Sequence, residues 1–222
     1  MKSPKLGSSL LSISPFQLKK TTIDLVQAGI DFIHIDVMDA NFVPNLALNC
    51  ETFKAVKTLT PEMPFDVHFM VSLNALRAIM PGFLSLAPKW MTFHVELDAP
   101  WQEFIDQCMK HQVKPGLAIN PDTPLEKIRP FLPFCEIVLL MSVPAGYGGQ
   151  SFRKETYDRL KLLCNWRKQG DNHFLIEVDG GINLPISREL IKLGADLIVI
   201  GSDLIAQTQK KEYIGQFHQS IQ

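Results

Sequence analysis

The sequence lacks several features that would point to particular classes of protein. Its net charge is only −1 over 222 residues, so no excess of positive charge favours binding to nucleic acid or to an anionic membrane. No apolar stretch approaches the ~18 residues that a membrane-spanning helix needs, and the N-terminus has no continuous hydrophobic segment typical of a signal peptide. No linker or low-complexity tract divides the chain, which predicts one domain over residues 1–222.

Cysteine is also scarce. The four cysteines, Cys50, Cys108, Cys135 and Cys164, are far apart and form no Cys-x-x-Cys pair. This spacing argues against a disulfide framework and against a metal–thiolate site, so we expect reduced, mostly buried thiols in a cytoplasmic protein. The apolar fraction of 46% is ordinary for a globular protein and is enough to form a core.

The chain does contain a regular alternation of short apolar runs with longer amphipathic segments. The expected strands are 6–13, 32–38, 65–70, 90–95, 114–119, 136–141, 174–178 and 197–200. The helical patterns between them include 15–28, 75–86, 101–111, 154–168 and 185–193. Ser14 and Pro15 predict a helix start, and Gly29 and Gly194 predict helix ends. Eight such strand–helix units predict an α/β fold, a single (β/α)8 barrel; a doubly wound sheet, which needs fewer strands, is the alternative.

Two of these expected strands carry polar side chains on one face. Because side chains alternate along a strand, His34 and Asp36 share one face of 32–38, and Asp66 and His68 share one face of 65–70. Histidine and carboxylate groups are costly to bury without partners. Two strands that each present such groups therefore indicate a shared site.

The barrel interpretation brings these groups together. Active sites of this fold lie at the C-terminal ends of the strands, where His34, Asp36, His68 and Asp179 would all face one mouth. Two imidazoles and two carboxylates predict a divalent metal site, and such mixed ligands do not distinguish Zn²⁺, Fe²⁺, Mn²⁺ and Co²⁺. A structural polar role would explain any one of these residues, but it explains four at matching strand ends poorly.

Glycine-rich phrases follow the last three expected strands. They are Gly146-Tyr147-Gly148-Gly149, Gly180-Gly181 after Asp179, and Gly201-Ser202, which opens the expected last helix. Glycines let backbone N–H groups approach an anion closely, and the loops after strands seven and eight are the usual phosphate site of this fold. Tight turns also need glycine, so the prediction of a phosphate site depends on all three clusters together.

Several longer phrases resemble one known family. They are residues 8–12 (SSLLS), 34–39 (HIDVMD), 42–45 (FVPN), 66–70 (DVHFM), 92–96 (TFHVE), 116–121 (GLAINP), 141–143 (MSV), 146–152 (GYGGQSF), 177–182 (EVDGGI) and 201–202 (GS). In this order, and over nearly the whole chain, they resemble the ribulose-phosphate 3-epimerase family. The resemblance implies a metal-dependent (β/α)8 barrel that acts on a phosphorylated ketose in pentose phosphate metabolism. It also implies a homo-oligomer.

The resemblance implies roles for the site residues by position. One divalent metal ion per chain would be held by His34, Asp36, His68 and Asp179. Asp36 and Asp179 would also be the catalytic acid–base pair. The substrate would contact Ser9, His68, Gly146, Tyr147, Gly148, Gly149, Asp179, Gly180, Gly181, Gly201 and Ser202. Three methionines would pack around the reacting sugar, Met38, Met70 and Met141, although ordinary core packing explains Met141 equally well.

The implied reaction interconverts D-ribulose 5-phosphate and D-xylulose 5-phosphate. Epimerisation removes a proton next to a ketone and returns one on the other face, so a carboxylate is needed on each side. The metal would act as a Lewis acid that stabilises the enediolate intermediate.

Departures from the family pattern lie in two loops. Ala40 and Asn41 stand where the family has glycine and histidine, and Pro144 comes one position early before Ala145 and Gly146. These changes leave open a 3-epimerase of a related ketose phosphate, such as D-allulose 6-phosphate. A catalytically silent sugar-phosphate-binding barrel is a further alternative, although the intact ligand set argues against it.

Two further observations concern a related enzymatic activity and two additional polar residues. Decarboxylases and lyases on a related barrel use an Asp-x-Lys-x-x-Asp phrase, whereas the phrase from Asp36 to Asp39 here has no lysine, which disfavours that activity. His94 and Glu96 also point to the barrel interior by parity, and we expect them to be supporting polar residues.

Overall fold

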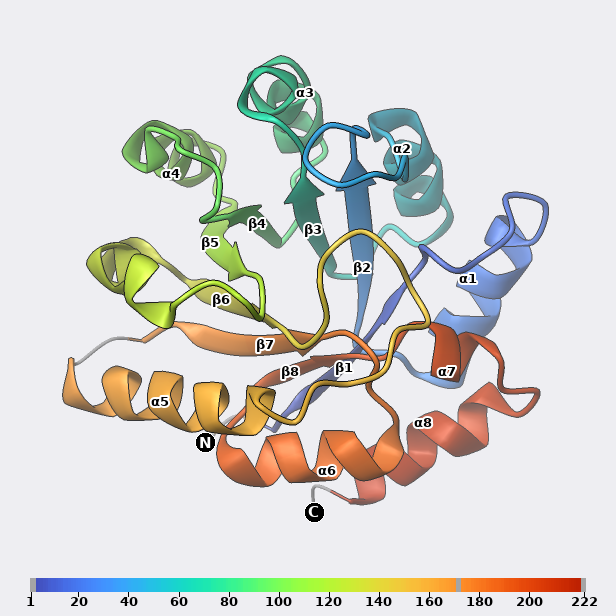
Figure 1. Ribbon diagram of the computed structural model, residues 1–222. Helices are drawn as coiled ribbons and strands as arrows, with labels where there is room; N and C mark the ends of the chain where they lie inside the picture. Colours follow the sequence, from blue (N-terminus) through green and yellow to red (C-terminus); the bar gives the residue numbers. More distant parts are fainter. Residues whose placement is uncertain (1–2, 171–172, 221–222) are drawn as a thin grey trace.

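The computed structural model describes residues 3–170 and 173–220, and its centre is a closed barrel of eight parallel strands surrounded by helices (Figure 1). The strands are β1 (Lys5–Ser9), β2 (Phe32–Met38), β3 (Phe65–Met70), β4 (Trp90–His94), β5 (Lys114–Ile119), β6 (Ile137–Met141), β7 (Leu175–Asp179) and β8 (Leu197–Val199). Because β1 pairs with both β2 and β8, the sheet closes on itself. The predicted (β/α)8 barrel is confirmed, and the doubly wound sheet is excluded.

The helices lie on the outside of the barrel (Figure 1). They are α1 (Leu18–Ala28), α2 (Cys50–Leu59), α3 (Leu73–Ser85), α4 (Trp101–Lys110), α5 (Thr156–Gln169), α6 (Leu184–Leu193), α7 (Ser202–Ile205) and α8 (Lys210–Gln219). Between β5 and β6 the connection contains only two 3₁₀ helices, η1 (Leu125–Lys127) and η2 (Arg129–Phe134). Among the described residues, no helix is both long enough and apolar enough to cross a membrane.

The predicted start of the first helix is wrong. Helix α1 begins at Leu18, because Ser14 to Gln17 form a turn in which the N–H of Gln17 donates to the carbonyl of Ser14 at 2.8 Å. Proline fits the second position of such a turn as well as it fits the first turn of a helix. The predicted helix ends are confirmed, since Gly29 and Gly194 both adopt left-handed conformations there.

Two other boundaries differ from the sequence-based expectation. The first strand ends at Ser9 rather than extending to residue 13, because the N–H of Leu11 donates to Ser9 Oγ at 3.0 Å and the chain turns away. Gly201 and Ser202 do not open the last helix. They open the four-residue helix α7, and the last helix is α8.

The outward faces of the strands pack against the helices. On β3 and β4, Phe69 and Phe93 are fully buried and stack with ring centroids 5.5 Å apart, and Phe83 of α3 contacts Phe69 edge-on at 5.1 Å. Burial of each such side chain contributes roughly 1.5–3 kcal/mol. This packing fixes the outward face of each strand, and the alternate residues are therefore held inside the barrel.

The inside of the barrel is closed at its N-terminal end by an apolar floor. The floor consists of five buried side chains, Phe32, Trp90, Ile137, Leu197 and Val199. Gly7 makes room for the ring of Phe32, since a Cβ on Gly7 would lie 2.3 Å from it. Two residues further along the strands, the interior becomes polar, with His34 on β2 and Glu177 on β7.

The loop after β2 contains a strained residue that provides a test of stability. Ala40 has φ 60°, a left-handed conformation that costs an L-residue roughly 1–2 kcal/mol. We therefore expect Ala40→Gly to raise the free energy of unfolding by about 0.5–1 kcal/mol, after the extra flexibility of glycine in the unfolded chain is taken into account. Urea denaturation would measure the change. The matched control is Ala206→Gly, because Ala206 has φ −68° and should lose stability on the same substitution. Loss of stability in both variants would contradict the prediction.

Candidate active site

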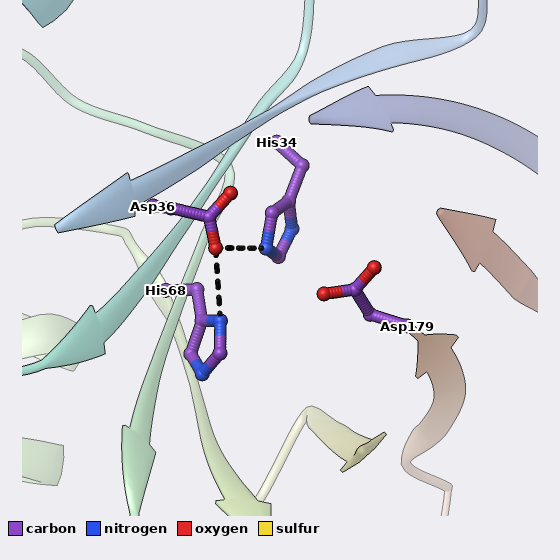
Figure 2. Close-up of side chains that lie close together, drawn as sticks. All are labelled: His34, Asp36, His68 and Asp179. Atoms are coloured by element: carbon purple, nitrogen blue, oxygen red, sulfur yellow. Dashed lines mark ion pairs between the residues drawn. The ribbon is translucent and has the colours of Figure 1, made fainter. Parts of the chain in front are cut away.

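Four of the predicted site residues meet at the C-terminal mouth of the barrel. His34 and Asp36 come from β2, His68 from β3 and Asp179 from the end of β7 (Figure 2). One nitrogen or oxygen from each of the four side chains lies within 4.8 Å of the others. The register of the sheet places Asp36 beside His68, and β7 brings Asp179 from across the mouth.

Asp36 lies between the two imidazoles. Its Oδ1 is 3.3 Å from Nε2 of His34 and 3.4 Å from Nδ1 of His68. Both nitrogens are buried and have no hydrogen-bond partner among the described residues, an arrangement that costs about 1–3 kcal/mol per group. Lone pairs that converge on one point satisfy the requirement of a divalent cation, and the nitrogen and oxygen donors suit a transition metal. The residues present therefore fit a metal ion.

A second pair of carboxylates lies on the other side of His34. Its Nδ1 is 2.7 Å from Oδ2 of Asp66 and 3.8 Å from Oε1 of Glu177, and all three side chains are fully buried. A carboxylate at Nδ1 favours a proton on that nitrogen and leaves Nε2 free to face the site. Asp66 lies on the face that the alternation of its strand predicts, but the sequence pattern alone indicates no role for Asp66 or for Glu177.

The clustered carboxylates shift the pKa values of the groups around them. Burial alone would lower the pKa of His34, but the negative charge of Asp36, together with the carboxylates of Asp66 and Glu177 beside the ring, outweighs it and raises that pKa well above its usual value. Burial raises the pKa of Asp179 to about 7, and the negative charge of Asp36 adds to this effect. Burial, with the charge of Asp66, raises the pKa of Glu177 to about 8. Repulsion among buried carboxylates is relieved by a nearby positive charge, as a bound cation would supply.

A pocket opens above this cluster. Its lining includes Ser9, Asp36, Met38, Met70, Met141, Gly146, Tyr147, Gly148, Gly149, Asp179, Gly180, Gly181, Gly201 and Ser202. The sequence-predicted substrate contacts thus come together, apart from His68, which lies beneath the pocket and is fully buried. Ser9 contributes directly to the cluster, because its hydroxyl donates to Oδ2 of Asp36 at 2.5 Å.

The glycines of this lining let two loops approach closely. Gly181, after β7, has φ 62°, and a Cβ there would lie 2.5 Å from the carbonyl oxygen of Gln150 and from the backbone nitrogen of Phe152. No other residue type fits this position without displacing the backbone. The loops after β6 and β7 therefore present their main chains side by side at the edge of the pocket.

The loops after β2 and β6 are joined across the mouth. Nδ2 of Asn45 donates to the carbonyl of Gly146 at 2.8 Å, and the hydroxyl of Tyr147 donates to the carbonyl of Pro44. Ala40, one of the departures from the family pattern, lies in the first of these loops, and Pro144 lies in the second. The departures therefore affect the loops over the pocket, whereas the four clustered side chains below are unchanged.

Comparison with known proteins identifies the family. The model of the "Ribulose-phosphate 3 epimerase family" matches residues 5–205, which include every residue of the cluster and of the pocket lining. The chain belongs to this family. The resemblance seen in the sequence is thus confirmed, and the protein is an enzyme of the isomerase class.

The relatives match over nearly their whole length. A ribulose-phosphate 3-epimerase of Serratia marcescens is 33% identical over 93% of this chain and 98% of its own. A protein of the same name from Escherichia coli strain K12 is 32% identical over 100% of this chain and 97% of its own. Another from Bacillus subtilis is 33% identical over 97% of this chain and 99% of its own. Among solved structures, KGPDC from Streptococcus mutans superposes with a TM-score of 0.74 at 12% identity, covering 99% of this chain and 98% of its own. That likeness concerns the fold alone.

Proposed function

We propose that the protein is a metal-dependent 3-epimerase that interconverts D-ribulose 5-phosphate and D-xylulose 5-phosphate. The observation that carries the proposal is the convergence of His34, Asp36, His68 and Asp179 beneath a pocket edged by glycine loops. Relatives that match over their full length are named ribulose-phosphate 3-epimerases, which supports the same reaction for this chain.

The four clustered side chains would hold one divalent cation, Zn²⁺, Fe²⁺, Mn²⁺ or Co²⁺. When bound, the cation supplies positive charge beside the oxygens on which negative charge develops as the proton leaves. The two unpartnered imidazole nitrogens support this assignment, since cation binding would satisfy both of them.

The acid–base work is assigned to two carboxylates. Asp36 reaches the pocket from β2 and Asp179 from β7, so the two can serve opposite faces of a sugar lying between them. One removes the proton from C3 and the other returns a proton to the other face, because a single base would restore the original configuration. The hydroxyl of Ser9 holds Asp36 in place, and Met38 and Met70 provide apolar walls that limit access of water to the carbanion.

The phosphate is assigned to the glycine loops at the other side of the pocket. The loops after β6, β7 and β8 line it with the main chains of Gly149, Gly180, Gly181 and Gly201, next to the hydroxyl of Ser202. Unobstructed backbone N–H groups are the usual ligands of a phosphate in this fold. The distance from this edge to Asp36 would then select the length of the sugar.

A ketose phosphate with one more carbon is the second candidate. Ala40, Asn41 and Pro144 alter the two loops that join over the sugar, and these loops would sense the extra carbon. D-allulose 6-phosphate is the corresponding hexulose, and its epimerisation would use the same carboxylates and the same metal ligands.

Steady-state kinetics would test the substrate. We expect kcat/KM for D-ribulose 5-phosphate to exceed that for D-allulose 6-phosphate by roughly 10–200-fold, because one carbon is worth about 1–3 kcal/mol of fit. Unphosphorylated D-ribulose should be poorer by about 10²-fold or more, because the charge-assisted hydrogen bonds to the phosphate would be lost, each worth about 1.5–3 kcal/mol. A preference for the hexulose phosphate would overturn the assignment of a pentulose substrate but would leave the proposed mechanism intact. Equal activity on the unphosphorylated sugar would contradict the assignment of a phosphate site.

A further inference from the structure

We propose that His94 and Glu96 are positioning residues that fix the ring of His68 so that its Nδ1 stays available to the metal. The inference deepens the proposed function, because it depends on His68 being a metal ligand. It assigns a purpose to two polar side chains that line neither the pocket nor the metal cluster.

The three side chains form a chain of close contacts at the ends of β3 and β4. Nε2 of His68 lies 2.9 Å from Nε2 of His94, and Nδ1 of His94 lies 2.8 Å from Oε2 of Glu96. Both imidazoles are fully buried, whereas the Glu96 side chain is 19% exposed. The chain of contacts thus runs outward from the metal cluster to the rim of the barrel.

Hydrogen-bond chemistry determines where the protons lie in this chain. A carboxylate only accepts, so Nδ1 of His94 carries the hydrogen that it shares with Glu96. In the neutral ring, Nε2 of His94 then bears a lone pair, and Nε2 of His68 must donate to it. His68 is therefore left with an unprotonated Nδ1, which is the nitrogen that faces Asp36 Oδ1 at 3.4 Å.

Glu96 is itself held in place from the neighbouring strand. Its Oε1 accepts the backbone N–H of Asn120, just after β5, at 2.8 Å, and the carbonyl of Asn120 accepts from Nη2 of Arg159 at 3.0 Å. Although partial burial alone would raise the pKa of Glu96, hydrogen bonds from His94, Thr123 and Asn120 lower it to about 2. The group is therefore a carboxylate at neutral pH, with both oxygens engaged.

A competing donor near His94 is weaker. Nδ2 of Asn120 lies 3.3 Å from Nδ1 of His94, farther than Glu96 Oε2 at 2.8 Å. If His94 accepted from Asn120, two lone pairs would face each other across the shorter contact, which is repulsive. The shorter contact therefore decides the tautomer.

This arrangement makes Glu96→Gln a sharp test. The two oxygens of Glu96 accept from different donors, so glutamine must turn its NH₂ group toward one of them. The backbone N–H of Asn120 cannot move its hydrogen whereas His94 can change tautomer, so the amide donor would face His94. His94 would then carry its hydrogen on Nε2, and His68 would be forced to protonate Nδ1, the nitrogen needed for the metal. Because glutamine and glutamate have nearly the same shape, the expected loss of metal binding would come only from the changed positions of the hydrogens on His94 and His68.

We expect Glu96→Gln to weaken Zn²⁺ binding by about 10–100-fold, as is typical when the hydrogen bonds that orient a ligating histidine from outside the metal site are disrupted. Competition with a chromogenic chelator would measure the affinity, and thermal unfolding followed by circular dichroism would show that the variant is folded. The matched control is Glu136→Gln on the surface, where Glu136 pairs with Lys114 at 2.9 Å, and its affinity should equal that of the wild type.

Substitutions of His94 separate hydrogen bonding from packing. In His94→Gln the side-chain carbonyl can still accept from His68, whereas in His94→Leu nothing can. The glutamine variant should therefore retain clearly tighter Zn²⁺ binding than the leucine variant. Equal losses in the two variants would show that His94 acts only by filling space, and would overturn the proposal.

The tautomer of His68 can be read directly, without metal. In the full-length protein treated with a chelator, ¹⁵N chemical shifts of the imidazole should show His68 protonated at Nε2 in the wild type and at Nδ1 in Glu96→Gln. An unchanged tautomer overturns the inference. If the wild type binds no Zn²⁺ at all, the metal site of the proposed function is refuted instead, and the ¹⁵N shifts still decide the hydrogen-bond chain.

Discussion

Replacing Asp179 or Asp36 with asparagine is expected to lower kcat by about 10²–10⁴-fold, the usual contribution of a positioned acid or base. Asparagine retains the shape of the side chain but neither accepts nor supplies a proton at this step. Because each carboxylate reaches the pocket from its own side of the mouth, neither can serve both faces of the sugar. Steady-state assays of epimerisation, with the metal content measured in parallel, would give the size of each loss.

Exchange with D₂O separates the two roles. The Asp179→Asn variant should still exchange the C3 proton of one epimer from the Asp36 face, while failing to invert the centre. The control is Asp122→Asn, because Asp122 is a surface residue whose side chain is 77% exposed, and its kinetics should be those of the wild type. Normal epimerisation by either active-site variant would rule out the two-base mechanism.

Replacing both His34 and His68 with alanine should abolish tight metal binding. The wild type should retain about one divalent ion per chain through gentle purification, whereas the double variant should retain almost none, because two of its four ligands would be gone. Elemental analysis by mass spectrometry would measure the ratio. The paired control replaces His111 and His218, which lie near the ends of α4 and α8. Equal metal content in the double variant and the wild type would show that the site is wrongly placed.

The alternation of side chains along two strands is sufficient to predict that three of the four metal-site candidates face the interior of the barrel. The strands β2 and β3 have the predicted bounds, and one parity argument placed His34, Asp36 and His68 on the same interior face. The family resemblance then supplied roles that parity alone could not give. The pattern is reliable here because a shift by one residue would turn the apolar helix-facing side chains of these strands into the barrel and the polar groups into the layer of helices.

Local signals were less reliable at the ends of elements. Ser14 and Pro15 fit a turn and a helix start equally well, and the structure has the turn, closed by the hydrogen bond from the N–H of Gln17 to the carbonyl of Ser14. The hydrogen bond between His68 and His94 was beyond sequence reasoning for a different reason. It depends on the relative position of two rings on neighbouring strands, which the closure and stagger of the barrel determine.

The apolar floor beneath the site has a consequence for the order of events. Among the residues that the structure describes, Phe32, Trp90 and their neighbours close the barrel at one end, and the site opens at the other end through the mouth between the joined loops. In the proposed function, the four candidate ligands would hold the cation at the bottom of this pocket, below the sugar. The cation would then bind before the sugar phosphate and dissociate after it. A shortage of the metal would therefore lower the metal content of the substrate-free enzyme, whereas the substrate-bound enzyme would retain its cation.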